Sequence, residues 1–148
     1  MEKKFIRVRS VGDITATILL IISGCTLMIL PTDASVNITG FILFFAGIVL
    51  ALFLKSGYKD MDTGERYCKK EHFFKQAMNA DICKSIAQDP ESIDLTEEDM
   101  GNSVRLDIYF NKAVKKAYIQ LYEYIPYTYK ACSRMYEYHI DKVTKLIK

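Results

Sequence analysis

Two long apolar runs near the start of the chain constrain its fold more than any other feature. Residues 14–30 read ITATILLIISGCTLMIL and residues 36–54 read VNITGFILFFAGIVLALFL, and Asp33 is the one ionisable side chain from Ile14 to Leu54. Each run is close to the length that a helix needs to cross the hydrocarbon layer of a membrane. Between the runs lies PTDAS, where a proline ends the first helix. The sequence therefore predicts a transmembrane helical hairpin over residues 14–54, with spans at 14–30 and 36–54.

The basic residues that flank these runs predict the orientation of the hairpin. Four basic residues precede the first span, the PTDAS turn has none, and five follow the second span within residues 55–70. Lysine and arginine are enriched on the cytoplasmic side of membrane spans. We therefore expect a multi-pass protein of the plasma (inner) membrane, with the basic N-terminus (1–13) and the C-terminus both in the cytoplasm.

Small residues offer a contact face between the two predicted helices. These residues are Ala16, Ser23 and Gly24 in the first span and Gly40, Gly47 and Ala51 in the second. Small residues let transmembrane helices approach closely. Neither span contains a charged side chain, which is the usual mark of an ion or substrate path. We therefore favour a passive anchor over a pore.

A second interpretation of the first span depends on Cys25. The stretch Ile22-Ser23-Gly24-Cys25 follows a basic leader and an apolar core, which is the layout of a lipoprotein cleavage region. The apolar run continues past Cys25 to Leu30, which is typical of a span and not of a mature lipoprotein. We favour the span, and lipidation of Cys25 remains the alternative.

The rest of the chain has the composition of a water-soluble domain. Residues 55–63 form a polar linker, and residues 64–148 contain nearly equal numbers of acidic and basic side chains. Helical periodicity favours amphipathic helices over 65–88, 97–125 and 127–148. We therefore expect an all-α membrane protein in which a cytoplasmic three-helix domain follows the hairpin.

The middle segment leaves an alternative open. Residues 104–110, VRLDIYF, alternate as a half-buried strand does, and residues 118–125 could pair with them. The intervening NKAVKKA has neither glycine nor proline, and an isolated two-stranded hairpin is marginally stable. We favour one long helix, and an α+β tail with a small hairpin at 104–125 is the alternative.

Two sets of side chains could carry chemistry in the soluble part. Cys68 with His72 and Cys132 with His139 each share one side of a predicted helix, so a Cys2His2 zinc site between helices can be imagined. The spacings match no familiar zinc module. Asp107 and Asn111 fall on the apolar side of the middle helix, where with Lys115 they could form a polar spot that reaches His139. We expect a satisfied buried network there.

No motif for phosphate binding, hydrolysis or redox chemistry is present, so we expect no enzymatic activity, no cofactor, and no catalytic or metal-binding residues. No basic stripe indicates nucleic-acid binding. Ten tyrosines and the acidic link QDPESIDLT favour a protein partner, with association of copies as a further option. The sequence thus predicts a membrane anchor, adaptor or modulator in contact with the lipid bilayer. The alternatives are a pore-forming or immunity-type membrane oligomer and a Cys/His metal-binding or enzymatic domain.

Overall fold

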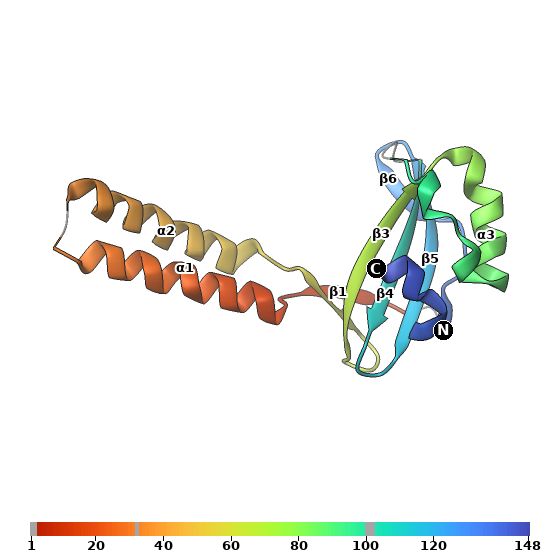
Figure 1. The fold of residues 1–148 in the computed structure, drawn as a ribbon, viewed down its shortest axis with the longest axis horizontal. Coiled ribbons are helices and arrows are strands. Elements are labelled where there is room, and N and C mark those ends of the chain that lie inside the picture. Colours follow the sequence, from red (N-terminus) through yellow and green to blue (C-terminus); the bar gives the residue numbers. More distant parts are fainter. Residues whose placement is uncertain (1–2, 32, 100–102) are drawn as a thin grey trace. The chain divides into compact units, whose positions relative to one another are not determined.

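The computed structural model describes residues 3–31, 33–99 and 103–148, and it divides the chain into two compact units (Figure 1). One unit is Ile6–Tyr58, which we call the hairpin unit. The other joins the chain up to Phe5 with Lys59–Lys148, and we call it the sheet unit. Each unit is described by itself below.

The hairpin unit consists mainly of two antiparallel helices that lie side by side (Figure 1). Helix α1 is Val11–Ile29 and helix α2 is Ala34–Phe53. Both are long and apolar enough to cross a membrane. Large apolar side chains such as Ile22, Phe41 and Leu52 are more than half exposed within this unit.

Glycines bring the two helices into contact, as the small residues of the sequence predict in part. Gly24, Gly40 and Gly47 are buried between α1 and α2. Ser23 and Ala16 are exposed, so they do not belong to the contact face. Helix α1 continues through Cys25 to Ile29 without a break.

The sheet unit corrects the predicted fold class, because residues 64–148 form a mixed α and β structure and not a three-helix bundle. Its strands and helices, in chain order, are β3 (Arg66–Phe74), η1 (Gln76–Met78), α3 (Asn79–Gln88), η2 (Pro90–Ser92), η3 (Leu95–Glu97), β4 (Val104–Asn111), β5 (Lys116–Ile125), β6 (Thr128–Ala131), β7 (Tyr136–His139), η4 (Ile140–Val143) and α4 (Thr144–Ile147). Strands β1 (Phe5–Val8) and β2 (Gly57–Asp60) flank the helical hairpin in the sequence.

Within the described residues the strands form one seven-stranded sheet. Its order is β1-β2-β3-β4-β5-β6, and β7 also pairs with β5. The predicted single helix over 97–125 is wrong, since β4 and β5 pair as an antiparallel hairpin with Ile108 opposite Ile119. The strand alternative was correct at this point, and its missing partners are β3 on one side and β6 and β7 on the other. The sequence predicts helices over 65–88 and 127–148 for these segments, and that prediction is wrong for β3, β6 and β7.

The turn between β4 and β5 lacks the residues that usually identify a hairpin in a sequence. The side-chain oxygen of Asn111 accepts hydrogen bonds from the backbone amides of Ala113 and Val114. Lys115 then adopts a left-handed conformation with φ of 53°. An asparagine side chain that caps its own turn replaces the glycine or proline usually found there.

Alternation along the strands separates the two faces of the sheet. Leu106 lies opposite His72 and Leu121, whereas Asp107 lies opposite Glu71 and Gln120. The first face packs against the helices to form the apolar core of the unit. This core contains Phe74, Ile82, Ile86, Ile93, Val104, Leu106, Ile108, Ala117, Ile119, Leu121, Val143 and Leu146. Full burial of one such aliphatic side chain contributes about 1.5–3 kcal/mol.

The second face contains an aromatic cluster, and we call it the concave face because the contacts of this cluster require the sheet to curl around it. The Phe5 ring stacks on Tyr109 at 4.2 Å and lies 5.7 Å from the ring of Tyr118. Strands β1 and β5 are far apart in the sheet order, so this contact requires the sheet to curl. Tyr67 completes the cluster, at 5.2 Å from Phe5 and 5.6 Å from Tyr118.

Candidate functional site

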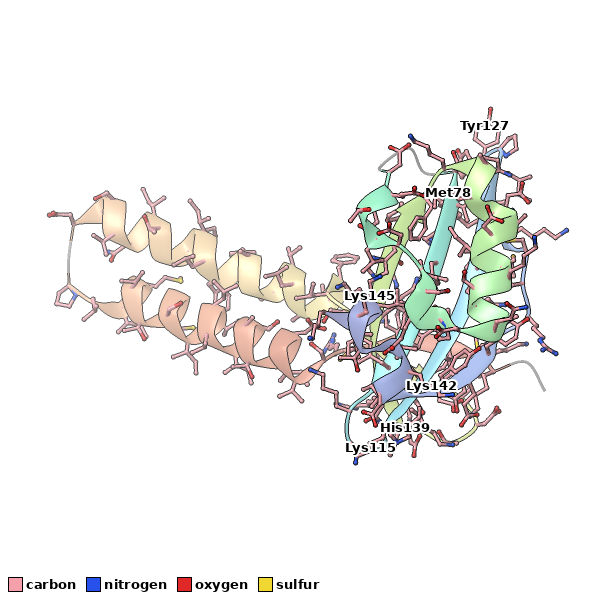
Figure 2. The ribbon with its side chains drawn as sticks, turned by 45° about the vertical axis from the view of Figure 1, so that its right-hand side comes forward. Met78, Lys115, Tyr127, His139, Lys142 and Lys145 are labelled. Atoms are coloured by element: carbon pink, nitrogen blue, oxygen red, sulfur yellow. The ribbon has the colours of Figure 1, made fainter. Side chains whose placement is uncertain are left out.

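The β5–β6 turn carries the most exposed aromatic residue of the sheet unit. Ile125 pairs with Thr128, so Pro126 and Tyr127 alone form the turn. Tyr127 is 97% exposed, and Tyr124 and Ile125 are 47% and 40% exposed. We call residues 124–127 the aromatic tip. Figure 2 places Tyr127 at one end of the sheet unit, with Lys115 and His139 at the other.

Backbone strain makes the aromatic tip unusual. Tyr127 has a φ of 72°, in the left-handed region where a two-residue turn normally has glycine or asparagine. Bulky residues in this region are rare, and such strain tends to occur at functional positions. The backbone amide of Tyr124 donates to the carbonyl of Ser103 at 2.8 Å. The Tyr124 ring packs edge-on against the ring of Tyr129. These contacts fix the conformation of the aromatic tip, which presents an apolar surface.

A buried ion-pair network occupies the concave face of the sheet. The Asp107 carboxylate is 2.7 Å from Lys69 Nζ and 2.8 Å from Arg105 Nε. Lys69 also contacts Glu71 at 2.5 Å. Burial raises the pKa of Asp107 above its ordinary value, and the Lys69 and Arg105 cations oppose this shift. The charges compensate one another, as burial requires.

This network extends to the base of the aromatic tip through Arg105. The guanidinium lies over the Tyr129 ring at 4.3 Å and over the Tyr122 ring at 5.1 Å. The Tyr122 hydroxyl donates to Gln120, whose amide donates to the carbonyl of Ser133. Cation–π contacts of this kind stabilise the ring positions. Asp107 thereby fixes Arg105, and Arg105 fixes the aromatic residues next to the tip.

The structure separates the four residues of the imagined zinc site. His72 is buried, with Nε2 2.6 Å from the Leu146 carbonyl and Nδ1 in contact with Glu98. Cys68 is exposed on β3, and His139 contacts Asp141 at 3.0 Å. Cys132 lies 3.7 Å from the side-chain oxygen of Asn79. Within the described ranges no group of three metal-ligating side chains converges.

Cys132 instead lies close to a different cysteine, which the sequence did not single out. The side-chain oxygen of Asn79 accepts from Cys83 at 3.5 Å as well as from Cys132. Burial raises the pKa of the Cys83 thiol, and burial together with the nearby Cys83 raises the pKa of Cys132 to about 11. Thiols with raised pKa values are poor nucleophiles at neutral pH. This geometry does not favour cysteine catalysis.

The predicted polar spot around Asp107 is divided between two places. Asp107 belongs to the ion-pair network, and Asn111 holds the β4–β5 turn. Lys115 does approach His139, because both line one surface pocket of about 430 Å³ that Lys116, Glu137 and Tyr138 also line. The four residues therefore do not form the single polar spot that the sequence suggested, although Lys115 and His139 line the same pocket.

The acidic link mainly shapes its own backbone. Asp89 accepts from the amide of Glu91, and Asp94 accepts from the amide of Thr96 at 2.9 Å. Asp94 therefore has a lowered pKa, caused first by this backbone hydrogen bond. These contacts are the local capping that such side chains provide in loops.

Sequence reasoning missed two polar sites next to the apolar runs. In the hairpin unit, Asp13 accepts from the amides of Ser10 and Ser56, and from the Ser56 hydroxyl at 2.6 Å. We call Ser10, Asp13 and Ser56 the hairpin clasp, because they connect the start of α1 to the chain beyond α2. The motif SVGD at residues 10–13 is a capping box, with Ser10 and Asp13 as its two members, and it was the sequence signal for this site.

The second missed site is Asp60 in the sheet unit. Its fully buried carboxylate contacts Lys3 Nζ at 2.5 Å and accepts from the amide of Asp62 and the hydroxyl of Thr63. Burial alone would raise the pKa of Asp60, but these hydrogen bonds outweigh burial and hold the pKa below its ordinary value. No short-range pattern links residue 3 to residue 60.

Comparisons with known proteins leave the function open. No family model, no curated protein and no solved structure matches the chain.

Proposed function

We propose that the chain is a membrane-anchored interaction protein: α1 and α2 cross the plasma membrane as a hairpin, and the cytoplasmic sheet unit binds a partner protein through the aromatic tip. The observation that carries the proposal is the tip itself, where a tyrosine that is 97% exposed occupies a strained turn position. Exposed apolar residues grouped in this way mark interaction sites. The proposal includes no catalytic step.

The membrane part of the proposal is supported by composition and exposure. Helices α1 and α2 have the length and hydropathy of spans, and most of their large apolar side chains are exposed within the hairpin unit. Basic residues flank the hairpin on both sides and are missing from the PTDAS turn. By the positive-inside rule, both flanks are then cytoplasmic.

The chemistry of the tip favours a protein partner over a lipid surface. Glu123 lies directly opposite Lys130 just below the turn, so the tip carries no excess of positive charge for anionic headgroups. Tyrosine is among the residues that contribute most to protein interfaces, where it fills a pocket with a ring of low conformational entropy. We therefore propose a partner with an apolar pocket that accepts the Tyr127 ring.

A substitution at Tyr127 separates binding from folding. Tyr127→Gly removes the ring and relieves the left-handed strain, so we expect the free energy of unfolding to stay equal or rise by up to about 1 kcal/mol. Affinity purification of the full chain in mild detergent should yield a stoichiometric partner for the wild type and lose it for Tyr127→Gly. Met61→Ser is the matched control, since Met61 is 59% exposed in the β2–β3 loop.

The proposal fails if the wild type yields no stoichiometric partner. It also fails if Tyr127→Gly retains the partner as well as Met61→Ser does.

A further inference from the structure

A basic pocket lies between the β4–β5 turn and the C-terminal helical segment of the sheet unit. It has a volume of about 330 Å³ and is lined by Lys112, Lys115, Ile140, Thr144, Ile147 and Lys148. Three of the six lining residues are lysines, two are isoleucines and none is acidic. The pocket therefore combines a positive rim with an apolar wall.

The turn that presents Lys112 and Lys115 is held in place from both sides. Asn111 accepts from the amides of Ala113 and Val114, and the carbonyl of Lys115 accepts from the amide of Ile140 at 3.0 Å. Lys115 itself is kept at a φ of 53°, which costs free energy for a residue with a Cβ. The lysine backbone is thus fixed relative to Ile140 on the opposite wall.

The pocket lysines differ from other lysines of the sheet unit in their pairing. Lys3, Lys69 and Lys116 each contact a carboxylate, namely Asp60, Asp107 and Glu137. Among the described residues, none of the three pocket lysines forms an ion pair. Two acids lie nearby in the sequence, and both have other contacts: Glu137 with Lys116 and Asp141 with His139. The positive charge of the pocket is therefore available to a ligand.

We propose that this pocket binds the phosphate of an anionic phospholipid headgroup. The lysine ammonium groups would contact the phosphate oxygens, and Ile140 and Ile147 would contact the glycerol and the first methylene groups of the lipid. Lysine acts as a point charge for phosphate and needs no fixed planar geometry. Lysine and arginine side chains at the cytoplasmic surface of a membrane are attracted to anionic lipid headgroups in this way.

A lipid fits this site better than free phosphate does, for two reasons. A free phosphate ion would leave the apolar wall without a contact. The chain also carries two helices able to cross a membrane, so a bilayer is the surface that this unit meets at high local concentration. The inference in this respect rests on the membrane anchoring proposed above.

The aromatic tip and the basic pocket lie at different ends of the sheet unit, as the positions of Tyr127 and Lys115 in Figure 2 show. A bound lipid would therefore leave the tip accessible to a partner. The lipid site would orient the unit, and the tip would recruit the partner.

Hydrogen–deuterium exchange of the full chain in nanodiscs tests this inference. Discs of phosphatidylcholine alone are compared with discs that also contain phosphatidylglycerol. We expect amides of residues 112–116 and 140–147 to exchange more slowly, by about fivefold or more, in the anionic discs, and high salt to remove the difference.

Charge-matched variants distinguish the pocket from general attraction to the membrane. The triple variant Lys112→Gln, Lys115→Gln, Lys148→Gln should lose the protection. The triple variant Lys75→Gln, Lys84→Gln, Lys130→Gln removes the same charge from exposed positions elsewhere and should keep it. Unchanged protection of Ile108 and Ile119 in the core shows that both variants are folded.

Three results would overturn the inference. Equal protection in both kinds of disc excludes an anionic lipid. Equal loss in both triple variants excludes this pocket as the site. Protection by inorganic phosphate in phosphatidylcholine discs, at the level that phosphatidylglycerol gives, assigns the pocket to a soluble ligand. Failure of the chain to insert into discs at all would instead contradict the proposed function, and this inference would fall with it.

Discussion

Gly24 of α1 and Gly40 of α2 lie in backbone contact. A Cβ atom on Gly24 would lie 2.8 Å from the carbonyl oxygen of Gly40 and 2.5 Å from the amide nitrogen of Phe44. A Cβ on Gly40 would lie 2.9 Å from the carbonyl oxygen of Gly24. Each glycine therefore permits the approach at the other, and any side chain there requires the helices to separate.

Gly24→Ala should destabilise the helical hairpin. The added methyl group overlaps backbone atoms that cannot rotate away, so we expect a cost of about 1–3 kcal/mol. Titration with sodium dodecyl sulfate in mixed micelles, followed by circular dichroism, measures this loss. Gly12→Ala is the control in the same helix, because a Cβ there meets nothing closer than 3.6 Å. Equal stability of the two variants would contradict the glycine contact.

The hairpin clasp gives a second prediction. Asp13→Ala removes the acceptor for the Ser10 and Ser56 amides and for the Ser56 hydroxyl, and it should cost about 1–3 kcal/mol in the same titration. Asp13→Asn keeps one acceptor oxygen and should lie in between. Ser23→Ala should change stability by less than about 0.5 kcal/mol, since Ser23 is exposed and its hydroxyl donates to the Leu20 carbonyl of its own helix. Equal stability of the three variants in this titration would show that the hairpin clasp does not stabilise the hairpin.

His72 should be intolerant of an apolar replacement. Its Nε2 donates to the Leu146 carbonyl, and Nδ1 contacts Glu98, so the ring joins β3 to α4 and to the chain before β4. His72→Phe fills the space but leaves these polar groups without their partner, at a cost of about 1–3 kcal/mol in guanidinium unfolding of the full chain. Glu98→Gln keeps an acceptor near the exposed end of this contact and should cost less. The opposite order of stabilities would be incompatible with the observed contacts.

Asp60 predicts a loss of stability in acid. Its folded-state pKa is lowered, so its contribution to the free energy of unfolding is fully present above the unfolded pKa of about 3.9 and is lost as the pH falls through the lower folded pKa. Unfolding midpoints of the wild type and Asp60→Asn should therefore differ near neutral pH and converge as the pH falls below the unfolded pKa.

Lys3→Met supplies the control for this pH dependence. Without the ammonium group, the pKa of Asp60 should rise. In the Lys3→Met background, the unfolding midpoints with Asp60 and with Asp60→Asn should therefore converge at a higher pH than they do when Lys3 is present. Carboxyl resonances of Asp60 followed by NMR report this shift directly. A midpoint difference that does not change with pH would show that Asp60 is not held ionised by Lys3.

The fold could be predicted where one physical requirement dominates the local sequence. An apolar run of this length has to be helical in lipid, and the proline after Leu30 ends it, so α1 and α2 were predicted to within a few residues. Gly24, Gly40 and Gly47 were correctly placed on the contact face for the same reason.

The sheet could not be predicted because its signals are non-local. In β3 the concave face carries Lys69 and Glu71, which are both charged. The Lys69 side chain is buried against Asp107 of β4, whereas Glu71 is exposed, so the strand lacks apolar alternation. At the end of the chain, two short strands and a 3-10 turn place Tyr136, Ile140 and Val143 at spacings that match a helix. In neither segment does the local sequence indicate which strand it pairs with.

The tyrosines show the same division. The sequence analysis took their number as a sign of a protein-binding surface, and two of them, Tyr124 and Tyr127, are exposed. Tyr67, Tyr109 and Tyr118 are buried around Phe5, a residue from the other side of the helical hairpin in the sequence. The number of tyrosines does not show which of them are exposed, because this depends on how the sheet curls around Phe5.

Cysteine accessibility in intact cells tests the membrane hairpin most directly. In a background with Cys25, Cys83 and Cys132 replaced by serine, one version keeps Cys68 in β3. A second version has Cys68→Ser as well and adds Ser35→Cys at the exposed start of α2. A membrane-impermeant maleimide should label Ser35→Cys in intact cells and should reach Cys68 only after the membrane is disrupted. Labelling of Cys68 from outside, or of Ser35→Cys only after disruption, would contradict a hairpin whose two flanks lie in the cytoplasm.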